Sequence, residues 1–187
     1  MRALIFGVLV LVMPAAGMAA TADDFLYGQT TAANGSMPYR YFVPPDYDAE
    51  RSYPLILFLH GAGERGNDNE QQLANHANGA MYLLDDANLA EQPVFMIAPQ
   101  CPSSGWWGGV TVLYAISAID QIAAQYHIDP NRIYVTGLSM GGMGTWSAVT
   151  QRPNLFAAAV PMSGSGNTSL APAVAHMPFW FFHAAND

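Results

Sequence analysis

Lysine is absent from the 187-residue sequence, and all six basic residues are arginines. This absence rules out a Schiff-base lysine and a P-loop lysine. The 14 acidic residues outnumber the basic ones, which gives a formal net charge of −8. That balance opposes binding to nucleic acid or to an anionic membrane surface, since both depend on neutralising phosphate.

Cysteine is almost as scarce, because Cys101 is the only one in the sequence. A single thiol cannot form an intrachain disulfide or a Cys-x-x-Cys metal site. Paired histidines at metal-ligand spacing are lacking too, and the acidic residues are too scattered for a calcium loop. We therefore expect neither a metal nor another cofactor.

A long apolar run occurs at the N-terminus, where Arg2 is the only charge among residues 1–22. The run, residues 3–12, is shorter than the about 20 residues that a membrane-spanning helix needs. Small residues follow it, as at the cleavage site of a secretory signal peptide. We therefore predict a signal peptide at residues 1–22, cleaved near Ala19 to Ala22, and a secreted or periplasmic protein without a membrane anchor.

The remaining sequence, residues 23–187, has the length of one domain. Short apolar runs alternate in it with amphipathic stretches, which is typical of an α/β fold with helices on both faces of a mostly parallel sheet. Several runs are continuously apolar, so both faces of those strands should be buried. We expect strands at 39–43, 55–59, 94–98, 133–136, 157–160 and 179–182, and helices at 69–84, 112–125 and 140–151.

The most informative segment is a G-x-S-x-G motif, Gly137-Leu-Ser139-Met-Gly141, between a predicted strand and a predicted helix. A serine on such a tight turn adopts an unusual backbone geometry, and the small residues beside it let neighbouring chain pass close. The helix start directs N–H groups and a positive dipole end at Ser139, so the N–H of Met140 can stabilise an oxyanion. We therefore predict that Ser139 is a nucleophile. A glycine-rich helix start that serves only close packing is the alternative.

A second glycine-rich turn directly follows the predicted strand 55–59 and reads His60-Gly61-Ala62-Gly63-Glu64-Arg65. In hydrolases with a nucleophilic serine at such a turn, the second oxyanion donor comes from the loop after an upstream strand. We expect the N–H of Ala62 to be that donor. His60, Glu64 and Arg65 should hold the loop, although the two charged side chains could instead reach substrate.

Taken together, these segments resemble an α/β-hydrolase, in particular the secreted esterases often labelled predicted peptidases, which are related to dienelactone hydrolase and polyhydroxybutyrate depolymerases. The matching blocks, in the order of the family, are 53–68, 98–102 with Trp106, 129–142 and 178–183. The resemblance implies a doubly wound, mostly parallel sheet, the nucleophile Ser139, an oxyanion hole at Ala62 and Met140, and the triad acid Asp187. The family has a His-Gly-x-x-Asp turn before this acid, and here Ala184 replaces its glycine.

The resemblance assigns none of the histidines of this sequence as the catalytic base, because the fold orders its triad along the chain as nucleophile, acid and histidine. All five histidines precede Asp187, and they are His60, His76, His127, His176 and His183. We therefore expect the sequence to be a C-terminally incomplete copy that lacks the last strand, the last helix and the catalytic histidine. Ser139 without its base should be a weak nucleophile, and the chain nearly inactive.

Two tryptophans, Trp106 and Trp107, follow the C-terminal end of a predicted strand, where ligands bind in open α/β sheets. They are candidates for the wall of a substrate pocket. The expected function is hydrolysis of small esters, or of esters derived from polysaccharides or polyesters. A secreted serine peptidase and a non-catalytic carbohydrate- or partner-binding module of the same fold are the alternatives.

Overall fold

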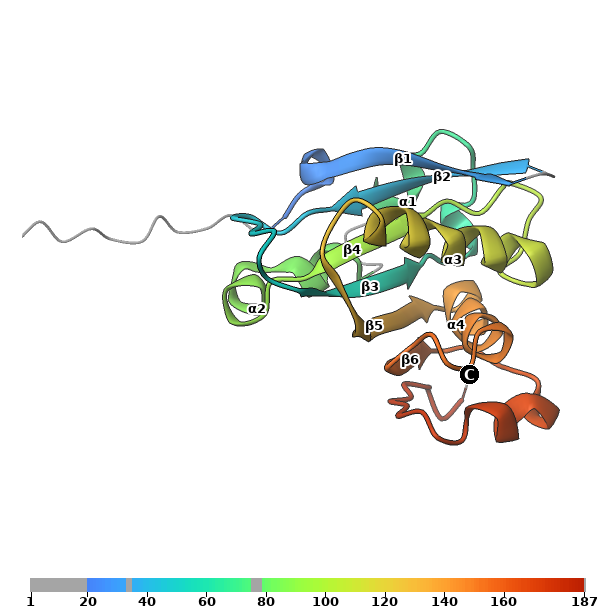
Figure 1. Ribbon diagram of the computed structural model, residues 1–187. Coiled ribbons are helices and arrows are strands. Elements are labelled where there is room, and N and C mark those ends of the chain that lie inside the picture. The colour runs from blue at the N-terminus through green and yellow to red at the C-terminus, as the bar shows by residue number, and fades with distance from the viewer. Residues whose placement is uncertain (1–19, 33–34, 75–78, 187) are drawn as a thin grey trace, which may run out of the picture.

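The computed structural model describes residues 20–32, 35–74 and 79–186 (Figure 1). Within these residues six strands form one sheet in the order β1-β2-β4-β3-β5-β6. The strands are β1 (Phe25–Ala32), β2 (Gly35–Phe42), β3 (Tyr53–Leu59), β4 (Phe95–Pro99), β5 (Ile128–Leu138) and β6 (Ala158–Met162). The pairs β1–β2 and β2–β4 are antiparallel, whereas β4, β3, β5 and β6 run parallel. The mostly parallel sheet predicted from the sequence is confirmed.

Helices cover both faces of this sheet (Figure 1). The α-helices are α1 (Gln71–Ala74), α2 (Asp86–Glu91), α3 (Gly109–Ala123) and α4 (Met140–Gln151). Short 3-10 turns occur at η1 (Ala22–Asp24), η2 (Ala62–Glu64), η4 (Met81–Leu84) and η5 (Thr168–Val174). Helices α3 and α4 bury their apolar residues in one core, and α1 and η4 bury theirs in another.

Strand β4 lies between the two cores. Phe95 and Ile97 belong to the core under α3 and α4, and Met96 and Ala98 belong to the core under α1 and η4. All five residues of β4 are buried, as the continuous apolar run predicts. No helix within the described residues is long and apolar enough to span a membrane.

Several elements differ from the predictions. Strand β1 was not predicted, since its polar and glycine residues form no apolar run. Helix α2 was not predicted either, because it buries none of its residues and so lacks an apolar stripe. The predicted strand 179–182 makes only two isolated bridges, Ala159 to Phe179 and Met162 to Phe182.

The predicted helix 69–84 is a further difference. Within it the structure shows only α1 and η4, and residues 75–78 lie outside the described residues. The side chain of Asp68 accepts the N–H groups of Glu70 and Gln71, so α1 begins at a capped turn. Gly79 has a φ of 92°, which interrupts helical geometry before η4. Most of the predicted signal peptide, residues 1–19, also lies outside the described residues.

Candidate active site

Ser139 lies at the junction between β5 and α4. Its backbone has φ 57° and ψ −114°, an unusual conformation that costs about 1–3 kcal/mol. Two hydrogen bonds fix it, because the N–H of Ser139 donates to the Met162 carbonyl and its carbonyl accepts from the Met143 N–H. The turn therefore places an exposed serine just beyond the carboxyl end of β5, in the geometry that the G-x-S-x-G motif predicts.

The glycines on either side of Ser139 lie against the end of β3. A Cβ atom added to Gly141 or to Gly137 would overlap the carbonyl oxygen of Leu59. That oxygen belongs to the backbone of a buried strand, so it cannot move aside without shifting the strand. Side chains are therefore excluded at both positions, and the neighbouring chain passes as closely as predicted.

The turn after β3 reaches the same edge of the sheet as Ser139. Strands β3 and β5 are parallel, and Leu59 pairs with Gly137. Ala62 and Met140 each lie three residues beyond this pair, at the carboxyl ends of adjacent strands. Met140 begins α4 and Ala62 begins η2, and the first N–H groups of a helix have no partner within it. The fold thus brings both predicted oxyanion donors to the carboxyl ends of β3 and β5, where Ser139 also lies.

His60 is fully buried and uses both ring nitrogens. Its Nε2 accepts the N–H of Cys101 at 2.9 Å, and its Nδ1 donates to the Gly61 carbonyl at 2.6 Å. Burial lowers the pKa of His60, which favours the neutral ring with its proton on Nδ1. These contacts confirm that His60 holds the loop.

The contact between His60 and the Gly61 carbonyl also orients the next amide. The peptide between Gly61 and Ala62 is trans, so its carbonyl and its N–H point in opposite directions. Because the carbonyl points toward the buried ring of His60, the N–H of Ala62 points away from that ring. Ala62 itself is exposed, so this backbone donor lies in an exposed part of the loop after β3.

Arg65 holds the same loop, as expected, and the Glu64 side chain lies close to His60 within it. The Arg65 guanidinium donates to the carbonyl of Ala62 at 3.0 Å and to that of Gly105 at 3.3 Å. The Glu64 carboxylate oxygen Oε2 lies 3.9 Å from Nδ1 of His60. This oxygen is buried and has no hydrogen-bond partner among the described residues.

Gly61 and Gly63, two glycines of this loop, differ in what surrounds them. A Cβ atom added to Gly61 would lie 3.1 Å from Oε2 of Glu64 and 3.7 Å from the Leu138 carbonyl oxygen. One added to Gly63 would have nothing within 4 Å. Gly61 is therefore packed between the loop and the end of β5, whereas no steric contact requires glycine at position 63.

Trp106 and Trp107 are neighbours in very different surroundings. Trp107 is 1% exposed, and its Nε1 donates to the His60 carbonyl at 2.9 Å. The expectation that Trp107 lines a substrate pocket is therefore wrong, because this residue is part of the core beneath the loop. Trp106 is 49% exposed and can contact a ligand.

Two of the described histidines lie far from Ser139. His127 precedes β5 and contacts the Ala49 carbonyl, so the length of the strand separates it from Ser139. His176 contacts the carbonyl of Pro153, which lies beyond the C-terminal end of α4. The 12 residues of α4 place that end roughly 18 Å from its start. Neither ring can reach the Ser139 hydroxyl.

His183 lies at the same edge of the sheet as Ser139. Leu138 pairs with Met162, and Met162 bridges to Phe182, so Ser139 and His183 both follow this row of residues. Two strand spacings separate the two positions, roughly 10 Å. The backbone arrangement alone therefore does not bring His183 within hydrogen-bond distance of Ser139.

The predicted triad acid, Asp187, lies outside the described residues, and so does His76. Within the described part of the chain, no three His, Cys, Asp or Glu side chains are grouped so that they could hold a metal ion. Burial raises the pKa of the Cys101 thiol to about 11, so this thiol is protonated at neutral pH.

Sequence reasoning missed the polar residues that hold the loop after β3 from its other side. Gln100 is fully buried, and its amide contacts Glu64, Asp68 and Asn69. The one available signal was a glutamine directly after a continuously apolar strand, where burial of its amide requires partners.

Comparison with known proteins places the chain among hydrolases. Residues 103–181 match the prolyl oligopeptidase family. A bifunctional acetylxylan esterase/xylanase of Neocallimastix patriciarum is 32% identical over 72% of this chain and 19% of its own. A poly(3-hydroxyalkanoate) depolymerase C of Paucimonas lemoignei is 36% identical over 78% of this chain and 36% of its own.

A solved structure shows the similarity over a longer stretch. The crystal structure of a thermostable esterase is 42% identical to the chain, with a TM-score of 0.85. The match covers 89% of this chain and 48% of that one. The chain therefore spans less than half the length of each of these three proteins.

Proposed function

Because this chain belongs to the α/β-hydrolase superfamily and is related to esterases, we propose that it hydrolyses carboxylic esters through an acyl-enzyme on Ser139. The observation that carries this proposal is the exposed, strained Ser139 at the edge where Ala62 and Met140 begin their helical turns. A serine so placed can attack a carbonyl carbon while two amides bind the oxygen that becomes negative.

The reaction has two steps. In the first, Oγ of Ser139 bonds to the carbonyl carbon and gives its proton to a base, and the alcohol leaves with a proton as its C–O bond breaks. In the second, water attacks the acyl-enzyme, the acid is released, and Ser139 recovers its proton. The N–H groups of Ala62 and Met140 stabilise the oxyanion in both steps. We assign Asp187 as the acid that orients the histidine base.

The proposed substrates are small esters, or esters derived from polysaccharides or polyesters. This range is supported by relatives named as an acetylxylan esterase and a poly(3-hydroxyalkanoate) depolymerase. Trp106 supplies an exposed indole that can pack against the acyl or alcohol part of the substrate.

A serine peptidase is the second candidate, favoured by the match of residues 103–181 to the prolyl oligopeptidase family. Comparing hydrolysis of p-nitrophenyl butyrate with that of aminoacyl p-nitroanilides separates the two. The ester proposal expects the ester to be cleaved and the anilides to remain.

We expect a polypeptide of residues 20–187 to hydrolyse p-nitrophenyl acetate slowly. The rings of His60, His127 and His176 cannot serve Ser139, and losing a general base costs about 10²–10⁴-fold in rate. Added imidazole can replace the base because Ser139 is exposed. The rate should therefore rise with imidazole concentration above the rate of free imidazole alone.

The matched control for this assay is Ser139→Ala, which should show only the reaction of free imidazole with the ester. Fast turnover without imidazole would contradict the expectation of a slow chain. In that case His183→Ala would show whether the histidine on the same side of the sheet as Ser139 acts as the base.

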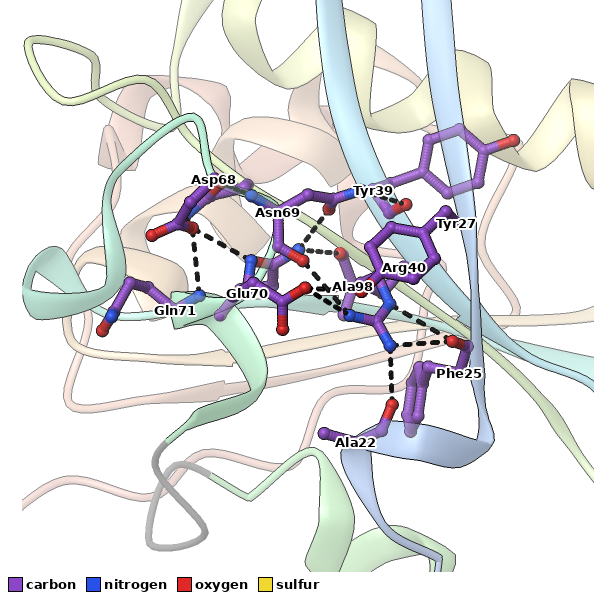
Figure 2. A network of polar contacts seen from close by, with 12 residues as sticks. Ala22, Phe25, Tyr27, Tyr39, Arg40, Asp68, Asn69, Glu70, Gln71 and Ala98 are labelled. Carbon is purple, nitrogen blue, oxygen red and sulfur yellow. Dashed lines mark hydrogen bonds and ion pairs between the residues drawn. The ribbon is translucent and has the colours of Figure 1, made fainter.

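We also propose that the protein is exported and that its signal peptide is cleaved after Ala19. Small residues at the two positions that signal peptidase reads allow cleavage after Ala19 or after Ala22. In the folded domain Ala20 is 8% exposed, and its N–H donates to the Leu84 carbonyl. The Ala22 carbonyl accepts from Nη2 of Arg40 at 2.7 Å (Figure 2). Cleavage after Ala22 would remove these contacts, whereas cleavage after Ala19 keeps them.

Expression of the full sequence in a bacterial host, followed by N-terminal sequencing of the periplasmic protein, checks this proposal. The expected mature N-terminus is Ala20. A mature protein that begins at Asp23 would contradict the chosen cleavage site, and one that still begins at Met1 would contradict export.

A further inference from the structure

The loop that carries Ala62 folds around the side chain of Gln100, the residue that follows β4. The amide oxygen of Gln100 accepts the N–H of Asn69 at 2.7 Å. Its Nε2 donates to Oδ1 of Asp68 at 2.8 Å and to the carbonyl of Glu64 at 3.3 Å. One buried amide thus binds three residues of a loop that is separate from it in sequence.

The next residue, Cys101, binds the same loop through its backbone. Its N–H donates to Nε2 of His60, and its carbonyl accepts the N–H of Gly66 at 2.9 Å. The Gln100 N–H donates to the Pro38 carbonyl in β2, which anchors this segment to the neighbouring strand of the sheet. Residues 100 and 101 therefore form a fixed template for the loop after β3.

The space around residue 100, as well as its hydrogen bonds, favours glutamine at this position. A Cβ atom added to Gly66 would lie 2.6 Å from Nε2 of Gln100, so the loop leaves room for the amide only with glycine there. Glutamate would keep the length but would set a second carboxylate against Asp68. Leucine would keep most of the volume but would leave the Asn69 N–H without its acceptor.

The far end of the loop is fixed by a separate network (Figure 2). The buried Arg40 guanidinium donates to the Asn69 carbonyl and lies 3.4 Å from the Glu70 carboxylate. Nδ2 of Asn69 donates to the Tyr39 carbonyl at 3.1 Å. Asn69 itself has a φ of 59°, a conformation that these contacts maintain. The loop after β3 is therefore held at Asn69 by Arg40 and along its length by Gln100.

We propose that Gln100 is a positioning residue of the oxyanion hole. By holding Glu64, Asp68 and Asn69, it fixes the loop in which His60 turns the N–H of Ala62 away from its ring. This inference rests on the proposed esterase function for its meaning, but the placement of the loop can be measured without turnover.

Amide hydrogen exchange measured by NMR in Gln100→Leu tests the proposal. The reporters are the N–H groups of Gly66 and Cys101, because their acceptors are not atoms of the Gln100 side chain. We expect both to exchange about tenfold or more faster in the variant, since three hydrogen bonds that hold the loop are lost. Amides inside β3 and β5 should keep their rates. Unchanged exchange at Gly66 and Cys101 would overturn the proposal.

The matched control is Gln72→Leu, which removes another buried glutamine. Gln72 is 1% exposed and donates to the Asn69 side chain and the Ala98 carbonyl, but not to residues 61–66. Exchange at Gly66 and Cys101 should not change in this variant. If Gln100→Leu does not fold, Gln100→Glu keeps the size and the acceptor for Asn69, and it should speed the same two reporters. Acceleration throughout the chain in Gln100→Glu would show a merely structural role and overturn the proposal.

Kinetics separates positioning from binding. In the imidazole-assisted ester assay, Gln100→Leu should lower kcat about tenfold or more with little change in KM, because a displaced donor acts on the transition state. An equal kcat in both proteins would overturn the proposal. If the esterase proposal is wrong, the parent chain will show no Ser139-dependent rate. The hydrogen-exchange measurement then still decides whether Gln100 positions the loop.

Discussion

Replacing Ser139 with alanine is expected to remove the esterase activity. Where a catalytic histidine is present, kcat should fall by about 10⁴-fold or more, because removing any member of a triad that acts as a unit costs this much. In the polypeptide of residues 20–187, the Ser139-dependent part of the imidazole-assisted rate should disappear. The folded structure should persist, because the backbone bonds to Met162 and Met143 do not involve the hydroxyl.

Ester hydrolysis and labelling by a fluorophosphonate, located by mass spectrometry, measure the effect of Ser139→Ala. Ser52→Ala is the matched control, because Ser52 is also exposed but precedes the start of β3, at the opposite end of the parallel strands from Ser139. Its rate should equal that of the parent. If Ser139→Ala hydrolysed esters as fast as the parent, the acyl-enzyme mechanism would be wrong.

Replacing Gly141 with alanine is expected to have the largest effect on stability. The new methyl group would overlap the Leu59 carbonyl oxygen, and neither β3 nor α4 can move without breaking the packing of the core. We expect the free energy of unfolding to fall by about 4 kcal/mol or more, which is beyond the range of ordinary substitutions. The midpoint of urea unfolding measures this loss.

Gly63→Ala is the matched control for that substitution. Position 63 lies in η2, and an added Cβ there has nothing within 4 Å. The free energy of unfolding should therefore change by no more than about 0.5 kcal/mol. Equal unfolding midpoints for Gly141→Ala and Gly63→Ala would mean that the close approach of α4 to β3 is not required.

Apolar pattern was enough to predict the centre of the sheet and the helices packed on it. Residues 140–151 were predicted as a helix and form α4, and both faces of β4 are buried as its continuous run indicates. At the antiparallel edge the pattern fails, because β1 has a solvent-facing side, with Tyr27 63% exposed. Helix α2 has no fully buried residue and packs only Leu89 against a core, so it carries no apolar stripe that periodicity could detect.

The candidate site was likewise predictable from the sequence only in part. Local motifs predicted the turn at Ser139 and the loop at Ala62, since glycines and a strand–turn–helix order are properties of neighbouring residues. The contacts of Gln100 with Asn69 and Asp68 join residues more than thirty positions apart, and no local pattern contains them. The burial of Trp107 also depends on a distant partner, the His60 carbonyl, so its sequence position alone was misleading.

Backbone atoms supply the proposed oxyanion contacts, and this has a consequence for how the protein can diversify. Ala62 is exposed and is proposed to act through its N–H alone, so the side chain at position 62 can change without altering the proposed chemistry. Substitutions must preserve the close packing of the main chain at Gly137 and Gly141 against the Leu59 carbonyl oxygen. New substrate preferences are therefore to be sought at position 62 and at Trp106, where substitutions leave this packing intact.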